Sequence, residues 1–230
     1  MKLIYDGKTK TVYDLENGYY RLYFKDSMTG ENGVFDPGAC TVGLTIEGAG
    51  KAGLALSAHY FRLIEEAGCP THFVDADVEK GLMTVKPASH FKGSGIEVVL
   101  RYKALGSFIR RYGSFIKEGA SLNAVIEITL KDDKRGDPLI NEEALMALGI
   151  FKKGEYKDIC DITRRICGII KDDLAKRGLD LADIKLEFGR GADGRIMLID
   201  EFSGGNMRVF DGDTWLDDPI KFAKRVLGNE

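Results

Sequence analysis

The chain has 230 residues, enough for one large domain or two small lobes, and its 44% hydrophobic and 30% charged content is typical of globular proteins. The formal net charge of -3 provides no overall basic field for a nucleic acid, so cationic residues that bind a ligand must act locally on a small anion. No apolar run could span a bilayer and no leader segment is recognisable, so we expect a cytoplasmic protein without a membrane partner.

The first part of the chain is predicted to be mainly antiparallel sheet. Asn17-Gly18 is a strong hairpin signal between two alternating segments. The glycine-rich region from Gly30 to Gly53 is too irregular for regular structure throughout, and helical spacing then predicts a helix that begins near Leu54 and ends before Gly68. The expected strands cover residues 3–5, 11–13, 20–24, 71–74 and 82–85.

The polar stretch from Lys86 to Gly95 is the predicted hinge between two lobes, residues 1–86 and 87–230. Asn141 is placed to cap a helix, and in the last helix apolar residues recur at helical spacing. We therefore predict an α+β fold. Beyond the hinge we expect strands at 96–100 and 127–130 and helices at 142–148 and 158–176.

Cysteine and histidine give no sign of a disulfide framework or a zinc site. The cysteines are Cys40, Cys69, Cys160 and Cys167. None has the two-residue spacing of a zinc ribbon or redox pair, so we expect free, mostly buried thiols. The three histidines are scattered, so a metal would be held by carboxylates, and oxygen ligands favour Mg²⁺.

Residues 183–201 are the most informative segment, because they form two alternating stretches around the hairpin dipeptide Asp193-Gly194. We place Lys185 across from Asp200, with Glu187 diagonal to Asp200. Diagonal neighbours of an antiparallel pair lie roughly 7–8 Å apart, which leaves room for one or two cations between the carboxylates.

The charged face of this hairpin can be interpreted in two ways. The opposite face, with Ile184, Leu186 and Phe188, is expected to be core. Two carboxylates and a lysine are costly to bury without a partner, and Mg²⁺ with a polyphosphate would provide one. The alternative is an exposed sheet face with a surface ion pair, and spacing alone leaves both readings open.

Three other clusters are candidates for phosphate binding, each with a structural alternative. Residues 7–10 (GKTK) combine a glycine with two lysines at a turn but do not match the P-loop pattern, so an exposed turn is the alternative. Residues 101–111 place arginines around the Gly106-Ser107 turn, as a phosphate cradle or as a basic helix face. Arg208 follows the Gly204-Gly205 turn, and it is either a second arginine that binds the phosphate or an ordinary surface residue.

Five segments together resemble the SAICAR synthetase family, the phosphoribosylaminoimidazole-succinocarboxamide synthases of purine biosynthesis. They occur in the family's order and span nearly the whole chain. The segments are YDGKTKTVY at 5–13, FKDSMTGENG at 24–33, EVVLRYKALGSFIRRYG at 97–113, KDDKRGDPLIN at 131–141 and KLEFGRGADGRIMLIDEFS at 185–203.

The resemblance implies a two-lobed, ATP-grasp-like fold with antiparallel sheets and ATP bound between the lobes. It implies that ATP phosphorylates the carboxylate of carboxyaminoimidazole ribonucleotide, and that the amine of L-aspartate then displaces phosphate to form an amide. ATP and Mg²⁺ are the implied cofactors. The implied partners are a small nucleotide and an amino acid, with no nucleic acid and no membrane, and a homodimer is left open.

The resemblance also implies roles for individual residues. The implied catalytic residues are Lys185, Glu187 and Asp200, of which Glu187 and Asp200 are magnesium ligands. The implied ATP-binding residues are Lys8, Lys10, Lys86 and Glu97. The implied substrate-binding residues are Arg101, Ser107, Asp183 and Arg208.

Some positions depart from the family's pattern. Ser203 is followed by Gly204-Gly205 where the family usually has Pro-Asp, and Leu105 stands where alanine is usual. The sequence therefore keeps two alternatives open. One is a divergent relative that ligates another carboxylate and amine, and the other is a small-molecule kinase.

Overall fold

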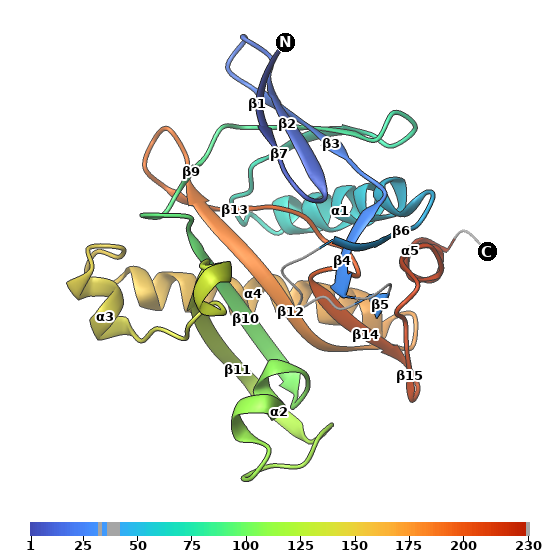
Figure 1. Ribbon diagram of the computed structural model, residues 1–230, viewed down its shortest axis with the longest axis vertical. Helices are drawn as coiled ribbons and strands as arrows, with labels where there is room; N and C mark the ends of the chain where they lie inside the picture. Colours follow the sequence, from blue (N-terminus) through green and yellow to red (C-terminus); the bar gives the residue numbers. More distant parts are fainter. Residues whose placement is uncertain (32–33, 36–41, 229–230) are drawn as a thin grey trace.

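The computed structural model describes residues 1–31, 34–35 and 42–228 and has an α+β fold built on antiparallel sheets (Figure 1). The fold class predicted from the sequence is therefore confirmed. Cys69, Cys160 and Cys167 are buried free thiols, as expected, whereas Cys40 lies outside the described residues.

The first sheet contains five strands in the order β1-β2-β3-β8-β7. Gly18, in the predicted hairpin turn between β2 and β3, has φ 87°, a conformation that glycine adopts without strain. A smaller sheet has the order β5-β4-β6. The strands are β1 (Lys2–Asp6), β2 (Lys10–Asp14), β3 (Tyr20–Phe24), β4 (Ser27–Glu31), β5 (Val34–Phe35), β6 (Val42–Thr45), β7 (Phe73–Asp77) and β8 (Leu82–Val85).

The second sheet has the order β11-β10-β12-β14-β15, and β9 and β13 both pair with β12. Ile184, Leu186 and Phe188 of β12 are buried, so this face is core, as predicted. Lys185 and Glu187 face the other way. The strands are β9 (Ser89–His90), β10 (Ile96–Lys103), β11 (Ser121–Leu130), β12 (Leu179–Arg190), β13 (Ile196–Ile199), β14 (Met207–Asp211) and β15 (Thr214–Trp215).

The predicted helix cap is confirmed: Asn141 accepts a hydrogen bond from the backbone N–H of Ala144 at 2.9 Å. Across the part of the chain that the structure describes, no helix combines the length and apolar character needed to cross a membrane. The helices are α1 (Ala49–Glu66), α2 (Ser107–Tyr112), α3 (Glu142–Ala147), α4 (Glu155–Ala175) and α5 (Pro219–Leu227).

Helix α1 begins earlier than the spacing of its apolar residues predicted, at Ala49 rather than near Leu54. A Cβ atom at Gly50 would lie 2.8 Å from the carbonyl oxygens of Phe24 and Lys25. Glycine is therefore needed here because the helix packs directly against the backbone after β3. The predicted start near Leu54 was wrong because residues 49–53 were counted with the irregular region, whereas close packing is what requires Gly50.

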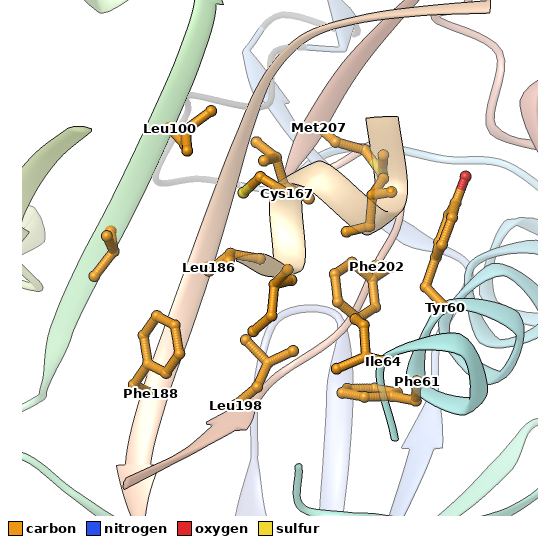
Figure 2. Packing of buried hydrophobic residues seen from close by; sticks show 14 of the residues in the cluster. Tyr60, Phe61, Ile64, Leu100, Cys167, Leu186, Phe188, Leu198, Phe202 and Met207 are labelled. Carbon is orange, nitrogen blue, oxygen red and sulfur yellow. The ribbon is translucent and has the colours of Figure 1, made fainter. Parts of the chain in front are cut away.

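One hydrophobic core joins helices α1, α3, α4 and α5 to both large sheets. Figure 2 shows the part of it where residues of α1 and α4 meet those of the second sheet. Phe61 of α1 stacks on Phe73 of β7 with ring centroids 5.4 Å apart, and it meets Phe202 edge-on at 5.0 Å. Helix α4 contributes the buried Ile159 and Ile166 from its predicted apolar stripe. The core therefore fixes the position of the first sheet relative to the second.

Backbone hydrogen bonds also connect the two sheets, through β13. The N–H of Leu198 donates to the carbonyl of Pro70, and the N–H of His72 donates to the carbonyl of Leu198, each at 2.9 Å. Strand β13 is thus bonded to β12 on one edge and to residues 70–72 on the other.

Candidate active site

A cavity of about 490 Å³ is lined by residues of both large sheets. Apolar side chains such as Val12, Leu22 and Val85 form part of its wall, and charged side chains form the rest. The structure thus gathers, in one cavity, every residue expected to bind ATP or metal or to act in catalysis. These residues are Lys8, Lys10, Lys86, Glu97, Lys185, Glu187 and Asp200.

A second cavity of about 170 Å³ adjoins the first, because Glu97, Lys185, Gly205 and Asn206 line both. The expected substrate-binding residues line this smaller cavity. They are Arg101, Ser107, Asp183 and Arg208. Side chains that are far apart in the sequence therefore meet in two connected spaces.

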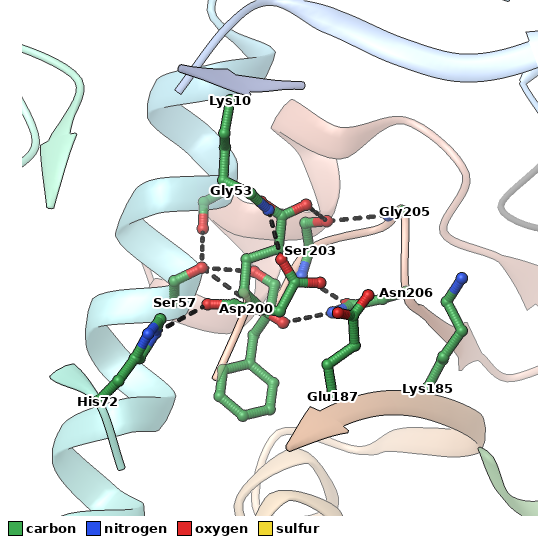
Figure 3. A network of polar contacts seen from close by, with 12 residues as sticks. Lys10, Gly53, Ser57, His72, Lys185, Glu187, Asp200, Ser203, Gly205 and Asn206 are labelled. Atoms are coloured by element: carbon green, nitrogen blue, oxygen red, sulfur yellow. Dashed lines mark hydrogen bonds and ion pairs between the residues drawn. The ribbon is translucent and has the colours of Figure 1, made fainter. Parts of the chain in front are cut away.

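The register of the β12–β13 hairpin differs from the predicted one by one residue. Glu187 lies opposite Ile199, so the expectation that Lys185 lies across from Asp200 was wrong. In a continued strand, this shift would turn Asp200 to the core face. Strand β13 instead ends at Ile199, and Asp200 adopts a left-handed conformation with φ 72°. Its carboxylate consequently faces the larger cavity together with Glu187 (Figure 3).

Asp200 is paired with a lysine from the first sheet. The Nζ atom of Lys10 lies 2.6 Å from Oδ1 of Asp200 and also contacts Glu201. Burial opposes ionisation of Asp200, but the attraction of Lys10, followed by that of Lys131, lowers the pKa of Asp200 to about 2. Burial likewise opposes the charge of Lys10, yet Asp200 and Glu201 hold the pKa of Lys10 above its usual range.

Glu187 is paired with Lys131, whose Nζ atom lies 2.5 Å from Oε1 of Glu187. Burial first, and then the negative charge of Asp200, raise the pKa of Glu187 to about 7, and Lys131 offsets only part of this. Lys131 stands in the KDDKRGDPLIN segment that contributed to the resemblance, but the sequence analysis gave it no role. The only indication in the sequence that Lys131 belongs to the site is its place as the first residue of this segment.

Glu97 and Glu187 lie directly opposite each other on β10 and β12, an arrangement in which like charges repel. Lys185 is bonded to one of them: its Nζ atom lies 2.8 Å from Oε1 of Glu97. Burial alone would lower the pKa of Lys185, but Glu97 raises it above its usual value. This cluster stands where the two cavities meet.

Lys8 and Lys86 are more exposed than the other lysines of the larger cavity. The Nζ atom of Lys8 lies 2.9 Å from Oδ2 of Asp133, and that of Lys86 lies 3.7 Å from Oε1 of Glu65. Both ion pairs are screened by solvent, so these lysines can exchange their partners for a ligand at small cost.

Arg101 is the centre of the smaller cavity's wall. It donates from Nη1 to Asp183 at 3.0 Å and from Nη2 to Ser107 at 2.8 Å. Arg208 holds the same aspartate with two hydrogen bonds of 2.9 and 2.7 Å. Gly106 has φ 55° and lies against this arginine, since a Cβ there would be 2.4 Å from Nη1 of Arg208.

The turn after Glu201 borders both cavities, since Gly205 and Asn206 line each of them. Its N–H groups are bonded within the turn: that of Ser203 donates to Oδ1 of Asn206 at 2.9 Å, and that of Gly205 donates to Oγ of Ser203 at 3.1 Å. The carbonyl of Asn206 accepts from the N–H of Lys185 at 2.7 Å. The residues that depart from the family's Pro-Asp pattern therefore form an ordered turn (Figure 3).

The chain matches known proteins over nearly its whole length. The family model for SAICAR synthetase matches residues 3–227. A phosphoribosylaminoimidazole-succinocarboxamide synthase from Clostridium tetani is 53% identical over 228 residues, 99% of this chain and 100% of that protein. One from Finegoldia magna is 36% identical over 93% of this chain and 88% of its own length. A solved SAICAR synthetase in complex with ADP has a TM-score of 0.86 and 30% identity, covering 99% of this chain and 98% of that one.

Proposed function

The chain belongs to the SAICAR synthetase family, and from this membership we infer where its ATP-dependent ligation takes place. The reaction joins the carboxylate of carboxyaminoimidazole ribonucleotide to the amine of L-aspartate in purine biosynthesis. The observation that carries the assignment is the pair of connected cavities, with Glu187 and Asp200 facing the larger one and the arginines lining the smaller one.

ATP binds in the larger cavity. Its apolar wall suits a purine base, and its lysines, Lys8, Lys10 and Lys86, suit the phosphates. Glu97 stands on the far side, where the two cavities meet. The solved relative described as a complex with ADP supports nucleotide binding in this fold.

Glu187 and Asp200 fit a magnesium site. They are carboxylates that face one cavity, and burial together with the charge of Asp200 raises the pKa of Glu187, a strain that a divalent cation would relieve. Among the described residues, no three histidine, cysteine or acidic side chains form a metal site by themselves, so phosphate oxygens would complete the coordination. Mg²⁺, when bound, supplies charge neutralisation at the phosphates.

The nucleotide substrate binds in the smaller cavity, with its 5′-phosphate held by Arg101, Ser107 and Arg208. A carboxylate oxygen of the substrate attacks the γ-phosphorus of ATP, and ADP leaves. The amine of L-aspartate then attacks the acyl carbon, and inorganic phosphate leaves as the amide forms. Asp183 orients both arginines, and Lys185 lines both cavities, where it can contact ligands in either one.

Residues 1–86 form a lobe that contributes the phosphate-binding lysines, and residues 87–230 form a lobe with the metal and substrate sites. The enzyme acts in the cytoplasm on small molecules, and the homodimer left open by the resemblance is the assembly to be tested. Light scattering of the purified protein measures the mass of the assembly, and the mass of a monomer would contradict the dimer.

The test of the function is ADP release from the purified protein with ATP, Mg²⁺ and carboxyaminoimidazole ribonucleotide, with and without L-aspartate. We expect release that requires all components and a succinocarboxamide product identified by its mass. Release without L-aspartate would instead indicate a kinase. If ATP binds but no amide forms, the cavities serve another carboxylate and amine.

A further inference from the structure

Beside the smaller cavity, five side chains form a chain of alternating charge. The two ion pairs at one end of it share Glu127, whose Oε2 accepts from Nε of Arg101 and from Nη2 of Arg111, each at 2.7 Å. The order along this charge chain is Arg111, Glu127, Arg101, Asp183, Arg208. Glu127 was assigned no role from the sequence, whereas Arg111 lies in the 101–111 segment that was expected to form a phosphate cradle or a basic helix face.

The three arginines differ in how many donors are already in use. Arg101 is 3% exposed and donates to Glu127, Asp183 and Ser107, so only two of its five N–H donors remain for the phosphate. Arg111 is 31% exposed, lines the cavity and donates only through Nη2. Within residues 1–31, 34–35 and 42–228, its Nε and Nη1 atoms make no hydrogen bond, and its guanidinium lies 5.7 Å from the ring centroid of Tyr112.

The contacts of Glu127 are not those expected of a group retained for stability. Its side chain is 7% exposed, and its second oxygen, Oε1, is buried without a hydrogen-bond partner in the described part of the chain. A buried acceptor left unpaired is destabilising. The contacts that Glu127 does make all serve to hold two arginines at the wall of one cavity.

We propose that Arg111 is a further substrate-binding residue, which holds the phosphate monoester of the nucleotide together with Arg208, and that Glu127 is the positioning residue that orients it. The proposal rests on the function proposed above for this cavity. Three arginines against two carboxylates leave one net positive charge in the charge chain, and the free donors of Arg111 match the oxygens of a phosphate.

The first experiment measures steady-state kinetics of Arg111→Gln and Arg111→Lys. We expect Arg111→Gln to raise the KM for the nucleotide on the order of tenfold to a hundredfold, because charge-assisted hydrogen bonds are lost. The kcat and the KM for ATP should stay unchanged, and Arg111→Lys should recover part of the affinity. Arg164→Gln, a surface arginine of α4 outside both cavities, is the matched control.

The second experiment separates positioning by Glu127 from a purely structural role. Glu127→Gln is combined with Arg111→Gln in a double-mutant cycle, and thermal unfolding is followed in parallel. If Glu127 acts through Arg111, the double variant has nearly the same KM for the nucleotide as Arg111→Gln alone. If the two single variants raise KM by factors that multiply in the double variant, Glu127 does not act through Arg111. That outcome would overturn the positioning role even if Glu127→Gln lowers the melting temperature.

A third experiment identifies the anion and does not depend on turnover. Calorimetry with ribose 5-phosphate should show binding to the unaltered protein and weaker binding to Arg111→Gln, even if the proposed ligation itself is not observed. A rise in the KM for L-aspartate alone would mean that Arg111 holds the amino acid's carboxylates, which overturns the phosphate assignment. Unchanged binding in every assay would overturn the proposal entirely.

Discussion

Asp200 combines a partly buried charge with a backbone conformation that few residues other than glycine adopt. Its φ of 72° ends β13 and turns the carboxylate toward Glu187 and Lys10. Such strain is maintained only where the surrounding structure fixes it, and it concentrates at functional sites. The geometry therefore matches the role proposed for Asp200.

Asp200→Asn tests that role with little change in shape. Asparagine tolerates the left-handed region, so we expect the fold and the melting temperature to be nearly retained. Turnover should fall roughly a hundredfold or more, because a charge aimed at the transferring phosphoryl group is lost. ADP release and thermal unfolding are measured on the same preparation. Near-normal turnover would show that Asp200 is not a metal ligand.

Glu187 should make the metal-free protein less stable as the pH rises. Its pKa of about 7 in the folded protein lies above the usual 4.5, so between these values the folded state holds a proton that the unfolded chain has released. The stabilising contribution is therefore complete below pH 4.5 and is lost as the pH approaches 7.

Because glutamine cannot ionise, the melting temperature of Glu187→Gln relative to the unaltered protein should increase from pH 5 to pH 8. Both proteins are measured in a chelator without nucleotide. His72, whose pKa burial lowers to about 4, favours higher pH in both proteins and cancels in the difference. A difference that is flat with pH would contradict the raised pKa.

At the scale of elements, periodicity predicted where most strands and helices lie, because the core faces of β12 and α4 follow the periods of 2 and 3.6 residues. It could not fix the hairpin register, since the turn spans 191–195 and shifts the pairing by one residue. Helix α5 was not predicted, although its buried residues Pro219, Phe222, Ala223 and Val226 recur at helical spacing directly after the capping residue Asp218.

Helix α5 depends on a cap that can be removed. Oδ1 of Asp218 accepts from the N–H groups of Ile220 and Lys221 at 2.9 and 3.0 Å, and Pro219 occupies the first turn. Asp218→Ala should cost about 1 kcal/mol and lower the melting temperature by roughly 2–4 °C, whereas Asp218→Asn should keep the cap. Equal stability of the two variants would exclude a contribution from the cap.

At the scale of the whole molecule, the sequence predicted the site residues through family motifs and not their partners. The motifs brought Glu187, Asp200 and Arg101 into one hypothesis. The pairs that surround them could not be foreseen, because Lys10 and Lys131 reach the carboxylates from different sheets, and such contacts depend on long-range packing.

Ligand binding should stabilise the whole chain, since the larger cavity is lined by both sheets. At a MgATP concentration a hundred times its Kd, linkage predicts about 2.7 kcal/mol of added stability. We expect a clear rise in the melting temperature with MgATP and a much smaller rise with ATP in chelator. Equal shifts in the two conditions would mean that nucleotide binding does not involve a metal.

Strand β13 has a mechanical consequence, because it is hydrogen-bonded on both edges and ends at the residue before Asp200. Any rotation of the first sheet is transmitted through residues 70–72 to this strand and so displaces the carboxylate. By thermodynamic reciprocity, a cation that fixes Asp200 also restricts that rotation. A change in the angle between the sheets therefore changes the affinity for the cation, and binding of the cation changes the preferred angle by the same coupling free energy.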